Sequence, residues 1–355
     1  MIVAGTALVL ATLVSALRTI VVPRATSARI TRFTFVMVRK VLGWVAHEGR
    51  TYEERDRILA VFAPLSLILL PFVWTLLVMA GFTAIHWGVD AESWRDAFLV
   101  SGSSMVTLGN VFHADIPSAA LSFLQASIGL LLIALLISYL PTIYSSFSRR
   151  ERLVAILESR AGLPPSPVEA LTRYQRIELL DGIDADMFVA WEGWFVDVEE
   201  SHTSIGALAF FRSPQPERSW ITAAGCVLDT ASIYLGVVDV DWSPHAALCI
   251  RTGTLALRRI AASFGIPFDP DPSPTDPVSV SRREFDNMCV ELIAIGIPIK
   301  ADRERAWADF AGWRVNYDTV LVSLAKMVDA PEGKWSSDRP GVRYTPRIWT
   351  RRLSD

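Results

Sequence analysis

Three long apolar stretches dominate the first half of this chain and constrain its fold more than any other feature. They cover residues 1–22, interrupted only by Arg18, residues 58–89 and residues 116–148. A helix needs about 20 apolar residues to cross a bilayer, and each stretch is long enough. Hydrophobic residues make up 51% of the 355 residues and charged residues 20%, and the apolar excess lies almost entirely before Arg149. The sequence therefore predicts a membrane-embedded half followed by a water-soluble half.

Charges between the stretches predict their orientation, because basic residues stay on the cytoplasmic side. The third stretch stops at Arg149-Arg150-Glu151-Arg152, and the loop before it is mainly acidic. The first stretch has no basic residue before it, which favours an uncleaved helix over a signal peptide. We expect a multi-pass plasma-membrane protein with its N-terminus outside and its second half in the cytoplasm. The segment between the first two stretches has eight basic residues: Arg24, Arg29, Arg32, Arg39, Lys40, Arg50, Arg55 and Arg57.

Within the basic segment 23–57, apolar residues recur at helical spacing between the basic ones. Examples are Ile30, Phe33, Met37 and Trp44. This pattern is typical of a helix that lies in the membrane interface. An ordinary helix packed on the cytoplasmic domain would produce the same pattern, and both interpretations stay open.

The stretch between the second and third apolar segments is the most informative. Residues 97–112 are uncharged, yet about 16 residues are too few to cross a bilayer and return. Non-helical backbone survives at membrane depth only when protein buries it or it lines a water-filled path. We therefore expect a re-entrant half-helix near 93–106 that points the negative end of its dipole at the bilayer centre. The backbone carbonyls of Thr107, Leu108, Gly109 and Asn110 would then line an ion path.

This arrangement resembles the two-transmembrane, pore-loop potassium-channel superfamily, whose signature is Thr-Val-Gly-Tyr-Gly. The chain has Thr107-Leu108-Gly109-Asn110-Val111, and the resemblance covers roughly residues 58–150. It implies a pore domain over 58–148, with a pore loop at 94–112 and an inner helix, in a homotetramer. It also implies that Gly129 is an inner-helix hinge, although glycine equally serves close packing of membrane helices; Pro141 is a gate candidate.

The departure from the signature concerns its last two positions. Asn110 stands in place of the aromatic residue, and Val111 in place of the second glycine. A valine does not readily adopt the positive φ that glycine allows. The filter is therefore degenerate, and we expect weak selectivity or a pore that has lost conduction.

The water-soluble half reads as a helical cytoplasmic domain over 168–330, after a linker at 149–167 and before an extended tail at 331–355. The pattern of apolar residues predicts helices, and no strand alternation argues for a sheet. The overall fold class is therefore an all-α membrane protein. The expected helices cover 168–182, 185–203, 218–238, 244–265, 281–297 and 302–329. Trp191 and Trp194 form an aromatic face that indicates core packing.

Motifs that carry chemistry are weak in this half. The pair Asp239 and Asp241 could hold a metal with a nucleotide sugar, but two aspartates at this spacing often arise by chance, and the five histidines lack ligand spacing. We expect no enzyme, cofactor or resident metal, and a net charge of −3 does not indicate nucleic acid. A group of arginines is a candidate site for an unidentified cytoplasmic ligand: Arg251, Arg258, Arg259, Arg282 and Arg283.

Taken together, these features predict an oligomeric channel for a monovalent cation, K⁺ or Na⁺, with a cytoplasmic regulatory domain. The alternative is a membrane-anchored sensor or scaffold whose pore loop is vestigial. A membrane-bound enzyme using Asp239 and Asp241 is the third interpretation.

Overall fold

A computed structural model describes residues 1–20, 29–46, 49–89, 93–109 and 115–340. Its regular structure is helical, and an isolated bridge between Val238 and Ile299 is the single pairing of extended backbone among these residues. The chain divides into two compact units. Unit 1 comprises residues 1–49 and 58–145, and unit 2 comprises residues 50–57 and 146–355. The prediction of an all-helical protein is confirmed.

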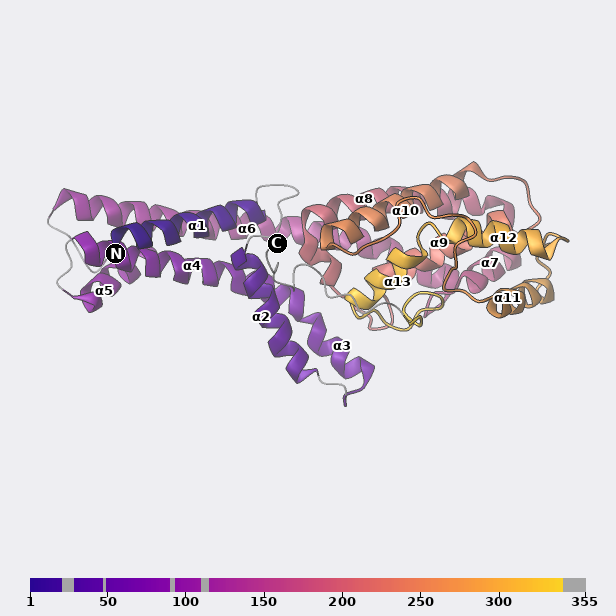
Figure 1. Cartoon of the computed structure of the whole chain (residues 1–355), viewed down its shortest axis with the longest axis horizontal. Coiled ribbons are helices and arrows are strands. Elements are labelled where there is room, and N and C mark those ends of the chain that lie inside the picture. Colours follow the sequence, from indigo (N-terminus) through magenta and orange to yellow (C-terminus); the bar gives the residue numbers. More distant parts are fainter. Residues whose placement is uncertain (21–28, 47–48, 90–92, 110–114, 341–355) are drawn as a thin grey trace. The chain divides into compact units, whose positions relative to one another are not determined.

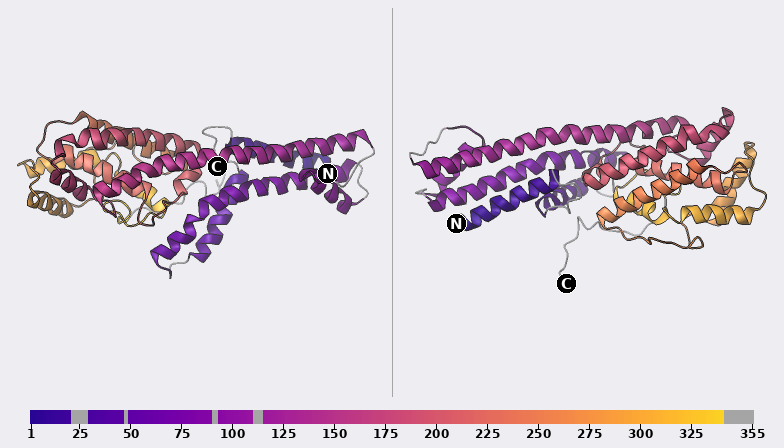
Figure 2. Two further views of the ribbon diagram at one scale, coloured as in Figure 1. Left: turned by 180° about the vertical axis from the view of Figure 1, so that it is seen from behind. Right: turned by 90° about the horizontal axis from the view of Figure 1, so that it is seen from above.

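Unit 1 is built on helices that are long and apolar enough to cross a membrane. They are α1 (Ile2–Ile20), α4 (Phe62–Val89), which lies in the candidate span Tyr52–Val89, and α6 (Ile116–Ala161), whose residues 116–145 belong to unit 1. Two further helices belong to this unit, α2 (Arg29–Val45) and α5 (Trp94–Met105). Figures 1 and 2 show α1, α4 and the first part of α6 running alongside one another. The three predicted apolar helices are therefore confirmed, and they mark a membrane-associated protein.

Small residues allow α1 to approach α4 closely. A β-carbon added to Gly5 would lie within 2.4 Å of the Gly81 carbonyl oxygen, and one added to Gly81 would lie 2.7 Å from a Val9 methyl group. Such contacts are typical of membrane helices, where close backbone packing replaces the hydrophobic driving force. The buried face of α1 continues through Thr12 and Ala16, so the whole helix rests against its neighbours.

The second apolar stretch begins with a helix break. Helix α3 (Tyr52–Ala60) ends just before α4, and Val61 lies between them. Pro64 lies in the first turn of α4, where its missing N–H costs no intrahelical bond. Pro71 lies inside α4 without ending it. The sequence predicts one span over residues 58–89, whereas the uninterrupted helix of the structure begins at Phe62.

Unit 2 is a bundle around one central helix. Every residue of α9 (Trp220–Gly236) is buried, as expected for a mainly apolar helix, and Asp229 is its one charged side chain. It packs against α7 (Pro167–Arg176), α10 (Pro244–Phe264), α12 (Arg303–Arg314) and α13 (Asp318–Met327), while α8 (Val189–Ser204) packs on α10. Trp191 and Trp194 are buried with ring centroids 4.5 Å apart, in agreement with their predicted core role. The remaining helix is α11 (Arg282–Ala294).

The stretch expected to form one helix over 302–329 is divided into α12 and α13. Tyr317 interrupts it with φ −123° and ψ −10°. Its side chain is fully buried, and its hydroxyl donates to Asp229 Oδ1 at 2.8 Å and lies 2.9 Å from Ser232 Oγ. The turn thus brings the tyrosine beneath α9, a tertiary requirement that local periodicity does not contain.

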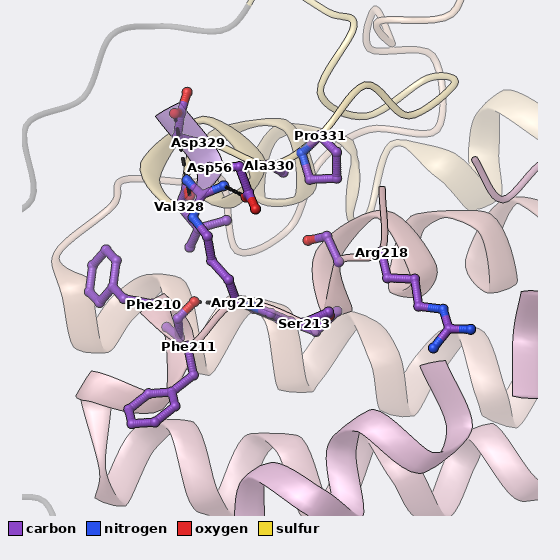
Figure 3. A pocket seen from close by; sticks show the side chains of 13 residues that line it. Asp56, Phe210, Phe211, Arg212, Ser213, Arg218, Val328, Asp329, Ala330 and Pro331 are labelled. Atoms are coloured by element: carbon purple, nitrogen blue, oxygen red, sulfur yellow. Dashed lines mark hydrogen bonds and ion pairs between the residues drawn. The ribbon is translucent and has the colours of Figure 1, made fainter. Parts of the chain in front are cut away.

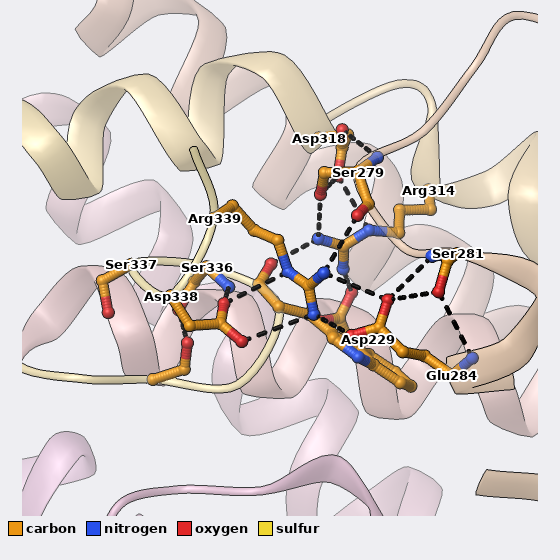
Figure 4. Close-up of polar contacts among 12 residues, drawn as sticks. Asp229, Ser279, Ser281, Glu284, Arg314, Asp318, Ser336, Ser337, Asp338 and Arg339 are labelled. Carbon is orange, nitrogen blue, oxygen red and sulfur yellow. Dashed lines mark hydrogen bonds and ion pairs between the residues drawn. The ribbon is translucent and has the colours of Figure 1, made fainter. Parts of the chain in front are cut away.

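A buried ion cluster holds this part of unit 2 together (Figure 4). Arg314 pairs with Asp229 on α9, and both side chains are 0% exposed. Arg314 Nε also donates to Asp318 at 2.8 Å, and its guanidinium donates to the Trp335 carbonyl. A buried charge without partners would strongly destabilise the folded chain, so each of these partners is needed to stabilise the buried guanidinium. The described start of the expected tail, residues 331–340, therefore contains a fully buried side chain, Trp335.

Candidate ion-conduction segment

Helix α5 occupies the place predicted for the half-helix, residues 93–106. Ser93 caps its N-terminus by accepting a hydrogen bond from Asp96 N at 3.1 Å. Ala97, Val100 and Met105 are buried on the side that packs against α4. The serine-rich run at 101–104 stays helical, so the chain reverses after it and not within it.

The helix ends in a turn centred on Thr107. Leu108 N donates to Ser103 O at 2.9 Å, and Thr107 N donates to Ser104 O at 3.2 Å. These two bonds define a Schellman motif, which places a left-handed residue just after the helix. Thr107 takes that conformation with φ 56°, an unusual value for a β-branched residue. The last-turn carbonyls of Ser103 and Ser104 are consequently engaged within the turn.

The candidate filter residues beyond this turn lie at the surface of the single chain. Thr107, Leu108 and Gly109 are exposed, Leu108 at 69%. Gly109 has φ 65°, a left-handed value that suits glycine. Asn110, the fourth candidate, lies outside the described residues. The structure thus places three of the four candidates together on one short uncovered segment.

Gly129 on α6 is the point at which α6 meets the end of α5. A β-carbon at Gly129 would lie 2.6 Å from the Met105 carbonyl oxygen, far inside ordinary contact. Ile128 and Leu132 flank this contact in the same buried cluster as Met105 and Trp74. The glycine therefore serves close packing. Helix α6 is continuous across both Gly129 and Pro141, the two residues singled out as hinge and gate.

A buried amide that sequence reasoning missed ties α5 to its neighbours. Gln125 Nε2 donates to both Ser101 O and Ser101 Oγ at 2.8 Å, and Ser101 Oγ donates to Met79 O at 2.8 Å. Gln125 and Ser101 are both 0% exposed. The available signal was that Gln125 is the one amide side chain between residues 116 and 148, since strongly polar residues in apolar helices are commonly functional.

In unit 2, one short segment, residues 208–212, contacts two helices that come before and after α5 in the chain. Arg150, on α6, is buried and donates to Leu208 O at 2.8 Å and Phe211 O at 2.7 Å. Arg212 donates to Asp56 on α3 and to Tyr52 Oη at 3.3 Å. We call residues 208–212 the clamp segment.

The pocket beside the clamp segment is lined by both charged and apolar residues, among them Asp56, Arg212, Phe210 and Phe211 (Figure 3). Arg212 also donates to Val328 O at 3.2 Å, and Asp329 accepts from Arg55 at 3.0 Å. Figure 3 shows Arg212 and Arg218 extending away from one another, and Arg218 pairs with Glu158. Arg55, Arg212 and Arg218 therefore all form hydrogen bonds or ion pairs within the protein.

His202 completes the environment of Arg150. Its Nε2 lies 3.2 Å from Arg150 Nη1, and because arginine only donates, this nitrogen accepts and carries no proton. Burial, followed by the charge of Arg150, lowers the pKa of His202 well below its usual value. The imidazole is therefore held neutral where α6 meets the clamp segment.

The other candidate groups are dispersed. Arg258 donates to the carbonyls of Asn316 and Pro270, Arg259 pairs with Glu199, and Arg282 pairs with Glu304. In the part of the chain that the structure describes, no three His, Cys, Asp or Glu side chains are grouped to hold a metal ion.

Comparison with known proteins adds no family assignment, since no protein-family model, curated protein or solved structure matches the chain.

Proposed function

We propose that the chain is one subunit of an oligomeric channel for a monovalent cation, K⁺ or Na⁺, and that unit 2 is its cytoplasmic regulatory domain. One observation carries the proposal. Between two helices apolar enough to span a membrane, a capped helix ends against Gly129 and leaves Thr107, Leu108 and Gly109 uncovered. Backbone groups in such a segment need protein or water around them at membrane depth, and an axis shared between copies supplies both.

The exposed side of α6 supports assembly from several copies. In the apolar part of α6 only 17% of residues are buried, against 44% for the span containing α4. Phe123, Leu130 and Ile137 are among its exposed side chains. A closed ring would cover part of this surface, and cyclic symmetry is the usual arrangement of identical subunits. We propose the fourfold ring that the sequence resemblance implies.

Re-entry of α5 into the bilayer and the topology belong to this proposal. The N-terminus would lie outside and unit 2 in the cytoplasm of a multi-pass plasma-membrane protein. The clamp segment favours a regulatory role for unit 2, because it binds α3, whose chain leads into α4, and also α6. A rearrangement of residues 208–212 would act on the helices before and after the pore segment.

The alternative function is a membrane-anchored sensor or scaffold with a non-conducting pore loop. The Schellman turn at Thr107 favours it, because that turn engages the carbonyls of Ser103 and Ser104 within the protomer. Those carbonyls belong to the negative end of the α5 dipole, which the channel would direct at a cation, and in this turn they accept hydrogen bonds from the protein. The two functions therefore differ in whether Thr107 and Gly109 line an ion path.

Cation flux through the purified chain in liposomes separates the two functions. We expect K⁺ or Na⁺ flux from the unsubstituted protein, and altered conductance or selectivity in Thr107→Ala and Gly109→Ala. Gly193→Ala is the matched control, because a β-carbon there meets no atom within 4 Å. If assembled particles show no cation flux under any pH, voltage or ligand applied, the channel proposal is wrong and the scaffold function stands.

A further inference from the structure

Helix α2 belongs to unit 1 and is fixed there along one face. Thr19 Oγ1 of α1 lies 2.7 Å from Thr31 Oγ1, and the rings of Phe35 and Phe62 meet edge to face at 6.0 Å. Thr34 and Val38 are buried on the same side. α2 therefore has a fixed orientation against α1 and α4, which determines what its other faces meet.

A second face of α2 is apolar and open to its surroundings. Successive residues of an α-helix are about 100° apart, so positions 33, 37, 41 and 44 fall on one stripe. Their exposed fractions are 63% for Phe33, 46% for Met37, 56% for Val41 and 84% for Trp44. An exposed apolar stripe of this length on one helix marks an interaction surface.

The third face of α2 is basic. The helix has four basic residues and no acidic one in its 17 residues. Arg29 and Lys40 are exposed and border the apolar stripe, while Arg32 lies half-buried farther round the helix. Arg39 lies over the Phe62 ring at 5.5 Å, which leaves Arg29, Arg32 and Lys40 as the charges available to a partner.

From these three faces we infer that α2 is a binding site for anionic phospholipid at the membrane surface. The stripe of Phe33, Met37, Val41 and Trp44 enters the boundary between headgroups and acyl chains. Arg29, Arg32 and Lys40 bind the phosphate groups beside it. The inference depends on membrane insertion of unit 1 and not on ion conduction.

The chemistry of the stripe and its flank favours a bilayer over a protein partner. Tryptophan concentrates at membrane interfaces, and amphipathic helices with basic flanks bind anionic bilayers. Clusters of basic residues next to a membrane helix select anionic lipids at about 1 kcal/mol per residue, which is roughly fivefold in affinity for each. A helix held beside two apolar spans, α1 and α4, already lies near such a surface.

A quenching experiment on the full chain tests the inference. The variant Trp44→Cys carries a fluorophore at the most exposed position of the stripe, and the three native cysteines are buried. The labelled protein is reconstituted in phosphatidylcholine vesicles that contain spin-labelled phosphatidylglycerol or spin-labelled phosphatidylcholine at equal fractions. We expect spin-labelled phosphatidylglycerol to quench the fluorophore at least about fivefold more strongly than spin-labelled phosphatidylcholine does. Iodide in the buffer should quench it little.

Two further variants assign the effect to the charges. Adding Arg29→Gln, Arg32→Gln and Lys40→Gln should abolish the preference for the anionic lipid. The matched control replaces three exposed arginines of unit 2, Arg176, Arg283 and Arg305, and should keep it. As a check independent of labelling, native mass spectrometry of the unsubstituted chain should retain more phosphatidylglycerol than the triple glutamine variant.

Three results would overturn the inference. Equal quenching by both lipids would mean an interfacial helix without selectivity for anionic lipid. Quenching by iodide alone would place the stripe in water, and protection from all three quenchers would mean that protein covers it.

Discussion

Replacement of Gly129 by alanine tests how α5 is held against α6. The added β-carbon would lie 2.6 Å from the Met105 carbonyl oxygen and 3.5 Å from the Met105 sulfur. A carbon atom needs about 3.5 Å to a non-bonded neighbour, so the two backbones would have to separate by roughly 0.9 Å. The Met105 oxygen belongs to the main chain and a β-carbon is fixed by its own backbone, so no side-chain rotation relieves the shorter contact.

The magnitude follows from a matched pair of glycine substitutions. Gly102→Ala on α5 adds a β-carbon whose nearest neighbour is the Met79 sulfur at 3.9 Å, an ordinary contact. Alanine favours a helix over glycine by up to about 1 kcal/mol at either position, so this gain cancels in the comparison. Overpacking costs about 1–3 kcal/mol. We therefore expect Gly129→Ala to be less stable than Gly102→Ala by that amount.

The assay is unfolding of the purified chain in mixed micelles with increasing dodecyl sulfate, followed by tryptophan fluorescence. A second reading is cation flux, which should fall in Gly129→Ala and persist in Gly102→Ala if the position of α5 governs the path. Equal unfolding free energies for the two variants would refute the close approach of α6 to the end of α5.

Three further predictions concern unit 2. Asp229→Asn leaves the buried Arg314 with Asp318 as its remaining carboxylate partner, and breaking the buried pair should lower the free energy of unfolding by about 3–5 kcal/mol. Exposure of the buried thiols should then occur at a lower temperature, and an unchanged midpoint would contradict the buried pair. The pKa of His202 in the folded chain lies well below 6.5, so between these two pKa values only the unfolded chain binds a proton at this residue. The free energy of unfolding should therefore fall by about 1.4 kcal/mol for each pH unit below pH 6.5. His202→Gln should remove that slope, and an identical slope in the variant would disprove the assignment. Asp56→Arg should release residues 52–57 from Arg212 and make their amide hydrogens exchange faster. The second substitution Arg212→Asp should restore the ion pair and slow that hydrogen exchange again. Fast exchange in the double variant would contradict a direct pair between the two residues.

The elements that sequence could predict are those set by local composition. Apolar runs predict α1, despite Arg18, and the first part of α6. The boundaries expected for α5, residues 93–106, differ by one residue at each end from Trp94–Met105. Ser281 and Glu284 form a capping box at the start of α11, and their three-residue spacing is the usual sequence signature of that motif. In each case the interactions join residues close in the chain, so periodicity and capping rules suffice.

What sequence reasoning missed depends on partners distant in the chain. Gln125 donates a hydrogen bond to Ser101, and Arg150 donates one to the Leu208 carbonyl. Arg212 donates to Asp56, which lies 156 positions away in the chain. The division at Tyr317 likewise depends on burying its hydroxyl against Asp229. No local pattern encodes these pairings, because each becomes favourable only after the helices pack and exclude water.

The most direct test of the proposed channel is an image of the detergent-solubilised particle viewed down its symmetry axis. We predict several copies, four in number if the resemblance extends to assembly, with Thr107–Gly109 of every copy converging on a central axis. A single protomer, or a ring in which these residues face the surrounding detergent, would contradict the account.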